Sequence, residues 1–160
     1  MPAYVLQAGE TRREARFIGG EVRVLAGIED TDEALSVIEA HVGRGGPSMH
    51  VHEKRDELLI VLEGELTIRS GEATYEAGPG FAAWIPHSTP HAFANQSDTP
   101  ARLIGICTPG GLEKSLTAHA DYVAGLAPGE ELDPAMLAEI AARHDGGRVV
   151  GPPILLAEND

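Results

Sequence analysis

The chain has 160 residues, of which 42% are hydrophobic, enough for one domain with a sizeable core. Its 12 basic and 25 acidic residues give a net charge of −13, which argues against nucleic acid or an anionic membrane as a partner. The single cysteine, Cys107, excludes an intramolecular disulfide and a multi-cysteine zinc site. The first residues are charged and lack an apolar segment of signal-peptide length, so we expect a cytoplasmic protein.

Residues 15–107 consist of short apolar or alternating runs separated by residues that favour turns. Gly and Pro together account for 30 of the 160 residues, so turns are frequent. The runs recur about every ten residues with no helical period between them, which predicts antiparallel strands in an all-β sandwich or barrel. The predicted strands are 15–18, 21–26, 35–42, 58–62, 65–69, 73–76, 81–85, 91–94 and 101–107.

Beyond Pro109 the pattern becomes helical. Residues 110–126 place apolar side chains about 3.6 residues apart, which indicates an amphipathic helix. A second helix is expected to begin after Asp133 as N-cap and to end at Gly146, and residues 149–156 are expected to lie extended against the body before an acidic tail. The predicted layout is a single domain, 1–160, with a barrel at about 15–107 and a C-terminal helical appendage at about 110–146.

Histidines are concentrated in one part of the chain. Five of the seven lie between residues 41 and 91. On a strand, residues two apart point to the same face, so His50 and His52 would project together and could meet one metal ion. Glu57 follows at the start of an apolar run, where a buried carboxylate needs a partner such as a divalent cation. An HxH pair alone is weak evidence, and a pair of exposed or hydrogen-bonded histidines is the alternative.

Two longer motifs make this pattern specific. Residues 45–64, GGPSMHVHEKRDELLIVLEG, and residues 80–95, GFAAWIPHSTPHAFAN, resemble the two motifs of the cupin superfamily. The chain departs from these motifs at two glycine positions. Arg44 occupies the first, which indicates a turn shifted by one residue, and Ser88 occupies the central glycine of the second motif. Serine fits such a turn if its backbone does not need a positive φ.

The resemblance implies a cupin jelly-roll β-barrel, or double-stranded β-helix, with C-terminal α-helices. It also implies four ligands for one divalent metal ion inside the barrel: His50, His52, Glu57 and His91. Three imidazoles and a carboxylate suit Fe, Mn, Ni, Co, Cu or Zn and leave coordination positions open. Candidates for the substrate pocket are inward-facing residues of neighbouring strands: Phe81, Phe93 and Asn95.

The single domain with a helical tail is similar to bacterial cupins of the quercetin 2,3-dioxygenase type. This resemblance implies that Glu57 is both a metal ligand and the general base that deprotonates a flavonol hydroxyl before O2 adds. We therefore expect a metal-dependent dioxygenase whose partners are O2 and a small aromatic or enolisable substrate. The alternatives are a cupin isomerase or lyase, and a non-catalytic module that binds a small molecule or a metal. We also expect a homodimer, with residues 4–7 forming a strand that reaches the partner subunit.

Overall fold

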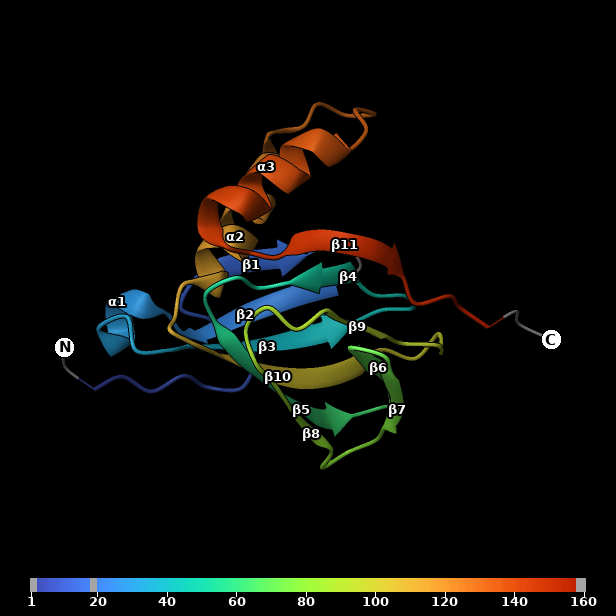
Figure 1. Ribbon diagram of the computed structural model, residues 1–160. Coiled ribbons are helices and arrows are strands. Elements are labelled where there is room, and N and C mark those ends of the chain that lie inside the picture. Colours follow the sequence, from blue (N-terminus) through green and yellow to red (C-terminus); the bar gives the residue numbers. More distant parts are fainter. Residues whose placement is uncertain (1–2, 18–19, 158–160) are drawn as a thin grey trace.

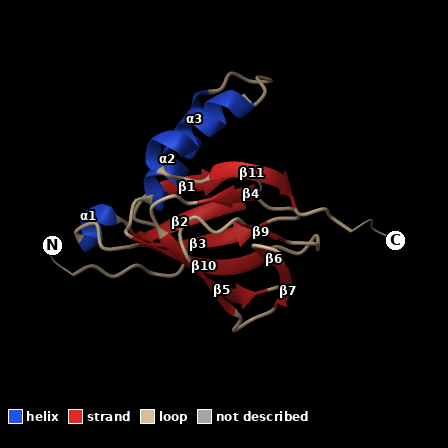
Figure 2. Ribbon diagram, in the orientation of Figure 1, coloured by secondary structure: helices blue, strands red, loops and turns tan. Residues whose placement is uncertain are grey.

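Residues 3–17 and 20–157 are described by a computed structural model, in which two antiparallel sheets lie beneath a pair of helices (Figure 1). Figure 2 shows the two longer helices together on one side of the strands and the short helix apart from them, near the N-terminus. The end of the first predicted strand at Ile18, the expected turn at Gly19 and the acidic tail at 158–160 lie outside the described residues.

The first sheet has six strands, in the order β1-β2-β3-β10-β5-β8. Their bounds are Glu14–Phe17 (β1), Gly20–Ala26 (β2), Ser36–Val42 (β3), Ala101–Thr108 (β10), Asp56–Glu63 (β5) and Ala82–Ile85 (β8). Strand β10 pairs with β3 on one side and with β5 on the other. Burial alternates along β5 and β10, as the period-two apolar pattern predicts for strands with one face in the core.

The second sheet has five strands, in the order β11-β4-β9-β6-β7. Their bounds are Arg148–Pro153 (β11), Ser48–Val51 (β4), His91–Ala94 (β9), Leu66–Ser70 (β6) and Ala73–Ala77 (β7). The inward faces of both sheets contribute to one core, whose buried members include Leu59 and Leu103 from the first sheet and Ile68 from the second. The extended segment expected near the C-terminus is therefore a full member of a sheet.

The jelly-roll architecture is confirmed, but the sheets are not closed into the barrel that was expected. Among the described strands, β1 and β8 end the first sheet and β11 and β7 end the second, and no backbone ladder joins one sheet to the other. The sheets are held together by side chains packed between them, as in a sandwich. Such packing needs only apolar inward faces, so an alternating sequence pattern does not distinguish it from a closed barrel.

Three helices are described: α1 (Ile28–Thr31), α2 (Leu112–Gly125) and α3 (Pro134–His144). The predicted N-cap of α3 is confirmed, because the side chain of Asp133 accepts a hydrogen bond of 2.8 Å from the amide of Ala135. Helix α3 ends at His144, and Asp145 is its C-cap in the left-handed conformation, with φ 51°. Helix α1, at four residues, is too short to show a helical period in the sequence. No helix in the described ranges is long and apolar enough to cross a bilayer.

The N-terminal segment contacts its own chain. The Tyr4 hydroxyl donates a 2.7 Å hydrogen bond to the Leu25 carbonyl, and the guanidinium of Arg12 lies 4.3 Å from the centre of the Tyr4 ring. Residues 4–7 do not form the strand that was expected there. The homodimer stays a prediction.

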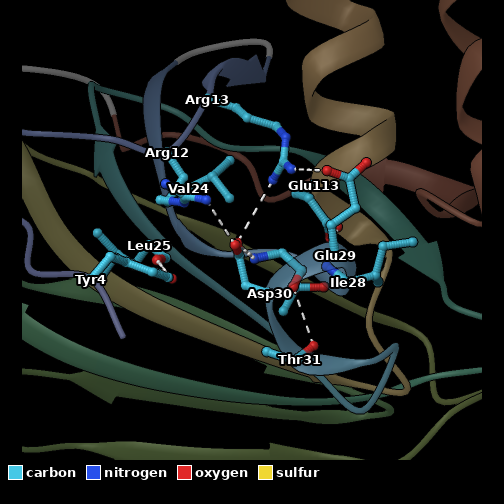
Figure 3. Close-up of polar contacts among 12 residues, drawn as sticks. Tyr4, Arg12, Arg13, Val24, Leu25, Ile28, Glu29, Asp30, Thr31 and Glu113 are labelled. Carbon is cyan, nitrogen blue, oxygen red and sulfur yellow. Dashed lines mark hydrogen bonds and ion pairs between the residues drawn. The ribbon is translucent and has the colours of Figure 1, made fainter. Parts of the chain in front are cut away.

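A cluster of polar contacts joins helix α2 to the turn that carries α1 (Figure 3). Glu113, in the first turn of α2, is 2% exposed and accepts a 2.8 Å hydrogen bond from the amide of Ile28. Its other carboxylate oxygen accepts a 3.1 Å hydrogen bond from Gly111. Nearby, the carboxylate of Asp30 forms ion pairs with the guanidinium groups of Arg12, at 3.0 Å, and of Arg13, at 3.8 Å. Glu113 thereby anchors the helical segment to the first sheet.

Replacing Glu113 with alanine is expected to lower the free energy of unfolding by about 1–3 kcal/mol, because the amide of Ile28 loses its acceptor. Urea denaturation measures this change. The control is Glu139→Ala, which removes an exposed ion pair with Arg143 within α3 and should change stability by no more than about 0.5 kcal/mol. Equal effects of the two substitutions would contradict the anchoring role of Glu113.

Candidate metal centre

The structure brings the four predicted ligand residues together between the two sheets. His50 lies on β4, His52 follows directly after it, and His91 begins β9, where it is paired with His50 across the strands. Glu57 comes from β5 of the opposite sheet. His52, Glu57 and His91 are each no more than 5% exposed. Both sheets therefore contribute to one buried polar site.

The side-chain atoms of this cluster are close. The ring centres of His50 and His91 are 4.3 Å apart, and that of His52 lies 5.1 Å and 5.3 Å from them. Oε2 of Glu57 lies 3.0 Å from Nε2 of His91 and 3.7 Å from Nε2 of His52. One carboxylate oxygen thus contacts two of the imidazoles.

Each imidazole is oriented by a hydrogen bond from its Nδ1. The acceptors are backbone carbonyls: Ser48 for His50 at 2.8 Å, Thr89 for His91 at 2.9 Å, and Asp145 for His52 at 3.2 Å. A carbonyl only accepts, so each Nδ1 carries the proton and each Nε2 keeps its lone pair when the ring is neutral. This arrangement is typical of metal-binding histidines, whose second nitrogen is held by an outer partner.

The spacing of the three imidazoles suits a metal ion. One ring nitrogen from each of the histidines lies within 4.8 Å of the other two. Metal–nitrogen bonds of about 2.1 Å place two ligands of one ion at most about 4.2 Å apart, so small side-chain movements are sufficient. The donor set of three imidazoles next to a carboxylate is one that first-row transition metals prefer. The residues present therefore fit the ion that the sequence motifs imply.

The charges of the cluster shift the pKa values of its members. Burial opposes ionisation of Glu57, but the hydrogen bond from His91 and the positive potential of the histidines outweigh it and lower the pKa of Glu57 to about 2. Burial, reinforced by the other two histidines, lowers the pKa of His50 to about 4. Burial also lowers the pKa of His52, whereas contact with Glu57 outweighs burial and raises the pKa of His91. The proton of the cluster thus belongs to the Glu57–His91 pair.

The predicted pocket residues have different surroundings. Phe93 is half-buried against the core and lies two residues beyond His91 on β9, so the two side chains share a face. Phe81 also packs against the core, and its ring centre lies 6.1 Å from that of the exposed Tyr75. The role of Phe81 and Phe93 in a substrate pocket stays a prediction.

Asn95 lies just beyond the end of β9 that is farther from His91. Its amide nitrogen donates to the carbonyls of Val42 at 3.0 Å and Thr99 at 2.8 Å, and its oxygen accepts from the amide of Ser97 at 2.9 Å. Both ends of the side-chain amide are engaged in this turn. The contacts account for Asn95 as part of a turn, and its place in a substrate pocket stays a prediction.

The two departures from the glycine motifs have different outcomes. Gly45 has φ 104°, consistent with a turn displaced by one residue from Arg44. Ser88 has φ 61°, so the turn does require a positive φ, and serine occupies it without the conformational freedom of glycine. A left-handed conformation costs a non-glycine residue about 1–2 kcal/mol. The amide of Ser88 donates a 2.7 Å hydrogen bond to the carbonyl of His52, which ties the strained turn to the metal centre.

Three residues near the cluster were not singled out from the sequence. The buried Cys107 on β10 directs its thiol toward Glu57, with Sγ 3.9 Å from Oε1, and burial raises the pKa of this thiol, which keeps it neutral. Arg55 and Asp145 form an ion pair of 3.2 Å beside His52. A sequence signal existed for Asp145, because an acidic residue at the C-terminal end of a helix opposes the helix dipole and needs a cationic partner.

The comparisons with known proteins agree with this geometry. The model of the cupin domain family matches residues 36–107, which include all four clustered side chains. The chain is also similar to quercetin 2,3-dioxygenase from Bacillus subtilis, with 28% identity over 124 residues, 76% of this chain and 36% of that enzyme. It therefore spans about a third of the length of this curated relative.

Solved structures share the fold. The polyketide cyclase RemF from Streptomyces resistomycificus is 25% identical with a TM-score of 0.56, and the match covers 68% of this chain and 80% of the cyclase. A predicted oxalate decarboxylase from Thermotoga maritima is 18% identical with a TM-score of 0.58, and the match covers 66% of this chain and 98% of the other. Proteins named for quite different activities thus share this architecture.

The metal-free protein is expected to lose stability as the pH falls from about 6.5 to 4. In this window unfolded His50 binds a proton, whereas folded His50, with a pKa of about 4, does not, so acid favours the unfolded state. Glu57 extends the loss from about pH 4.5 to 2, because protonation removes its contacts. His91, with its raised pKa, acts in the opposite sense: its contribution is present below pH 6.5 and is lost as the pH rises through its folded value.

Urea denaturation of the metal-free wild type and of His50→Gln at several pH values between 7 and 4 tests this expectation. The substitution removes one titrating group, so the slope of stability against pH should decrease by up to about 1.4 kcal/mol per pH unit. Identical slopes for the two proteins would show that His50 does not control the acid response.

Proposed function

We infer from the match over residues 36–107 that the chain is a member of the cupin superfamily, and we propose that it is a metal-dependent cupin enzyme of the dioxygenase type, acting on a small aromatic or enolisable substrate. The observation that carries the proposal is the convergence of three Nε2 atoms and one carboxylate in a buried site. The proposed metal ligands are His50, His52, Glu57 and His91, and the proposed ion is Fe, Mn, Ni, Co, Cu or Zn. The similarity to quercetin 2,3-dioxygenase supports the choice of reaction type.

A bound divalent ion would supply Lewis acidity toward an oxygen of the substrate. The protein side chains would hold and move the proton. Glu57 is ionised at neutral pH, and its Oε2 is placed to accept a proton from a substrate hydroxyl. The acidic hydroxyls of enols and phenols, which can also chelate through oxygen, would give a proton to this carboxylate more readily than simple alcohols would.

The side chains around Glu57 determine where that proton can go and how far water can reach it. In the metal-free protein Nε2 of His91 lies 3.0 Å from Oε2 of Glu57, so the two side chains share one proton there. With an ion on Nε2 of His91, a proton taken from the substrate would stay on the carboxyl group of Glu57. The neutral thiol of Cys107 faces the other oxygen and provides a weak donor there. We assign Phe81 and Phe93 to the apolar wall beside the site, where they would exclude water from the reacting atoms.

A second candidate is a cyclisation or isomerisation without O2. The similarity to the polyketide cyclase RemF favours it, because that match reaches 25% identity and covers four fifths of the cyclase. The same carboxylate base would serve either chemistry, since both begin with removal of a proton from an enolisable substrate. A module that binds a small molecule or a metal without turnover is the remaining alternative.

His52→Ala is expected to lose most of the metal that the wild type binds, because it removes one of three converging nitrogens. Elemental analysis of the protein after loading with each candidate metal measures the stoichiometry. The matched control is His87→Ala, because His87 is exposed and pairs with Asp56 rather than with the cluster. Unchanged metal content in His52→Ala would contradict the ligand assignment.

Glu57→Gln is expected to keep part of the metal and to lose activity by about 10²–10⁴-fold, because the proton acceptor is gone. Oxygen consumption with quercetin, enediols and diketones, under Fe, Mn, Ni or Co, measures the activity. Substrate conversion without O2 uptake would favour the cyclase-like candidate. Tight binding of these compounds by the wild type with no turnover under any of the metals would contradict the enzyme proposal.

A further inference from the structure

The orientation of His52 differs from that of the other two histidines. His50 and His91 direct their Nδ1 atoms to carbonyls two residues back in the chain. His52 directs its Nδ1 to the carbonyl of Asp145, which lies 93 residues away. The first two contacts come with the local backbone of their own segments, whereas the third exists only while the end of α3 is docked beside β4.

The residues that follow α3, residues 145–147, form what we term the cap segment. The carboxylate of Asp145 accepts hydrogen bonds from the amides of Glu53 at 3.0 Å and Lys54 at 3.2 Å, and from Nε of Arg55 at 3.2 Å. The guanidinium of Arg55 also donates to the carbonyl of His144 at 3.1 Å. The backbone carbonyl of Asp145 therefore contacts His52, and its side-chain carboxylate contacts the loop that runs from His52 toward Glu57.

The two glycines of the cap segment are packed too closely for other residues. A Cβ on Gly146 would lie 1.9 Å from Oγ of Ser115 on α2, and one on Gly147 would lie 2.6 Å from Cδ2 of His50. Gly147 also has φ 112°. The cap segment thus lies between helix α2 and the ring of His50.

The strand that follows extends the same contact. Val149 of β11 is paired with His50, and Arg148 is paired with Val51. Figure 1 shows α3 leading directly into β11, which lies beside β4. The C-terminal segment therefore contacts β4 along the part that carries His50 and leads to His52.

The conformation and the charge of Asp145 are both unfavourable at this position, and its contacts offset them. It is a non-glycine residue in the left-handed conformation, and its negative charge lies at the C-terminal end of a helix, where the dipole disfavours it. Arg55 is 7% exposed and carries a charge that needs a partner. The ion pair of these two residues neutralises both charges beside His52.

We propose that Asp145 is a positioning residue of the metal centre: it holds His52 as the Nδ1–H tautomer, with Nε2 directed at the ion, and couples metal binding to docking of the α3–β11 segment. This inference rests on the metal site proposed above. Outer partners of metal-binding histidines contribute about 10–100-fold to metal affinity. Because coupling is reciprocal, a bound ion in turn stabilises the docked cap segment.

The test compares Asp145→Gly and Asp145→Asn with the wild type, using Co²⁺ as the probe metal. Glycine keeps the left-handed backbone and removes the carboxylate, whereas asparagine keeps one acceptor oxygen and loses the charge. The control is Asp32→Gly, because Asp32 has the same left-handed conformation, with φ 52°, at the exposed end of α1. Competition with a chromophoric chelator measures the dissociation constant for Co²⁺.

We expect Asp145→Gly to bind Co²⁺ about tenfold or more weakly, Asp145→Asn to be intermediate, and Asp32→Gly to stay within about twofold of the wild type. Wild-type affinity in both Asp145 variants would overturn the positioning role, as would equal weakening in Asp32→Gly. If Asp145→Gly does not fold, Asp145→Asn decides, since it keeps a hydrogen-bonding side chain in place.

A second measurement needs no metal. Long-range ¹H–¹⁵N NMR spectra of the metal-free proteins report which nitrogen of His52 carries the proton. The wild type is expected to show the Nδ1–H tautomer alone, and Asp145→Gly a mixture of both tautomers. An unchanged tautomer in Asp145→Gly would overturn the inference. Failure of the wild type to bind Co²⁺ would instead overturn the proposed function, and the tautomer comparison would still decide the role of Asp145.

Discussion

The negative charge of Glu57 has to be balanced in the interior, between two sheets whose facing sides are otherwise largely apolar. Leaving a buried carboxylate unpaired costs several kcal/mol, and the imidazoles from the opposite sheet offset this cost through direct contacts of 3.0 Å and 3.7 Å. The same contacts join β5 of the first sheet to β9 and to the residue that follows β4 in the second. The side chains proposed to bind the metal are therefore also the side chains that join the two sheets at this point.

The strands could be predicted from the sequence because burial alternates with period two and turns separate the runs. The proximity of His50, His52, Glu57 and His91 could be predicted because the motifs place these residues at a recognisable spacing. What could not be predicted is non-local. Whether two sheets close into a barrel depends on ladders between distant strands, and the roles of Asn95 and Asp145 depend on carbonyls and amides of other segments. The identity of a residue can indicate that it needs a partner, as for Asp145, but it does not say which distant backbone groups it will contact.

The positive φ of Ser88 illustrates a further limit. Serine in place of the glycine of the related motifs left the conformation of this turn open, and the structure gives it a positive φ. The tertiary contact with the carbonyl of His52 outweighs the local preference. The cupin architecture likewise does not specify one reaction, because a dioxygenase, a cyclase and a predicted decarboxylase resemble this chain. The side chains around the carboxylate carry the argument for function.

The 93-residue separation between His52 and its backbone acceptor bears on the order in which the site assembles during translation. All four proposed ligands precede α2 in the chain and therefore leave the ribosome before it does. Three later parts of the site emerge only with the last quarter of the described chain. They are the Asp145 carbonyl that orients His52, the Asp145 carboxylate that pairs with Arg55, and strand β11 beside His50. A nascent chain can therefore form its strands and gather its histidines early, yet it completes the binding site only after α3 and β11 have docked.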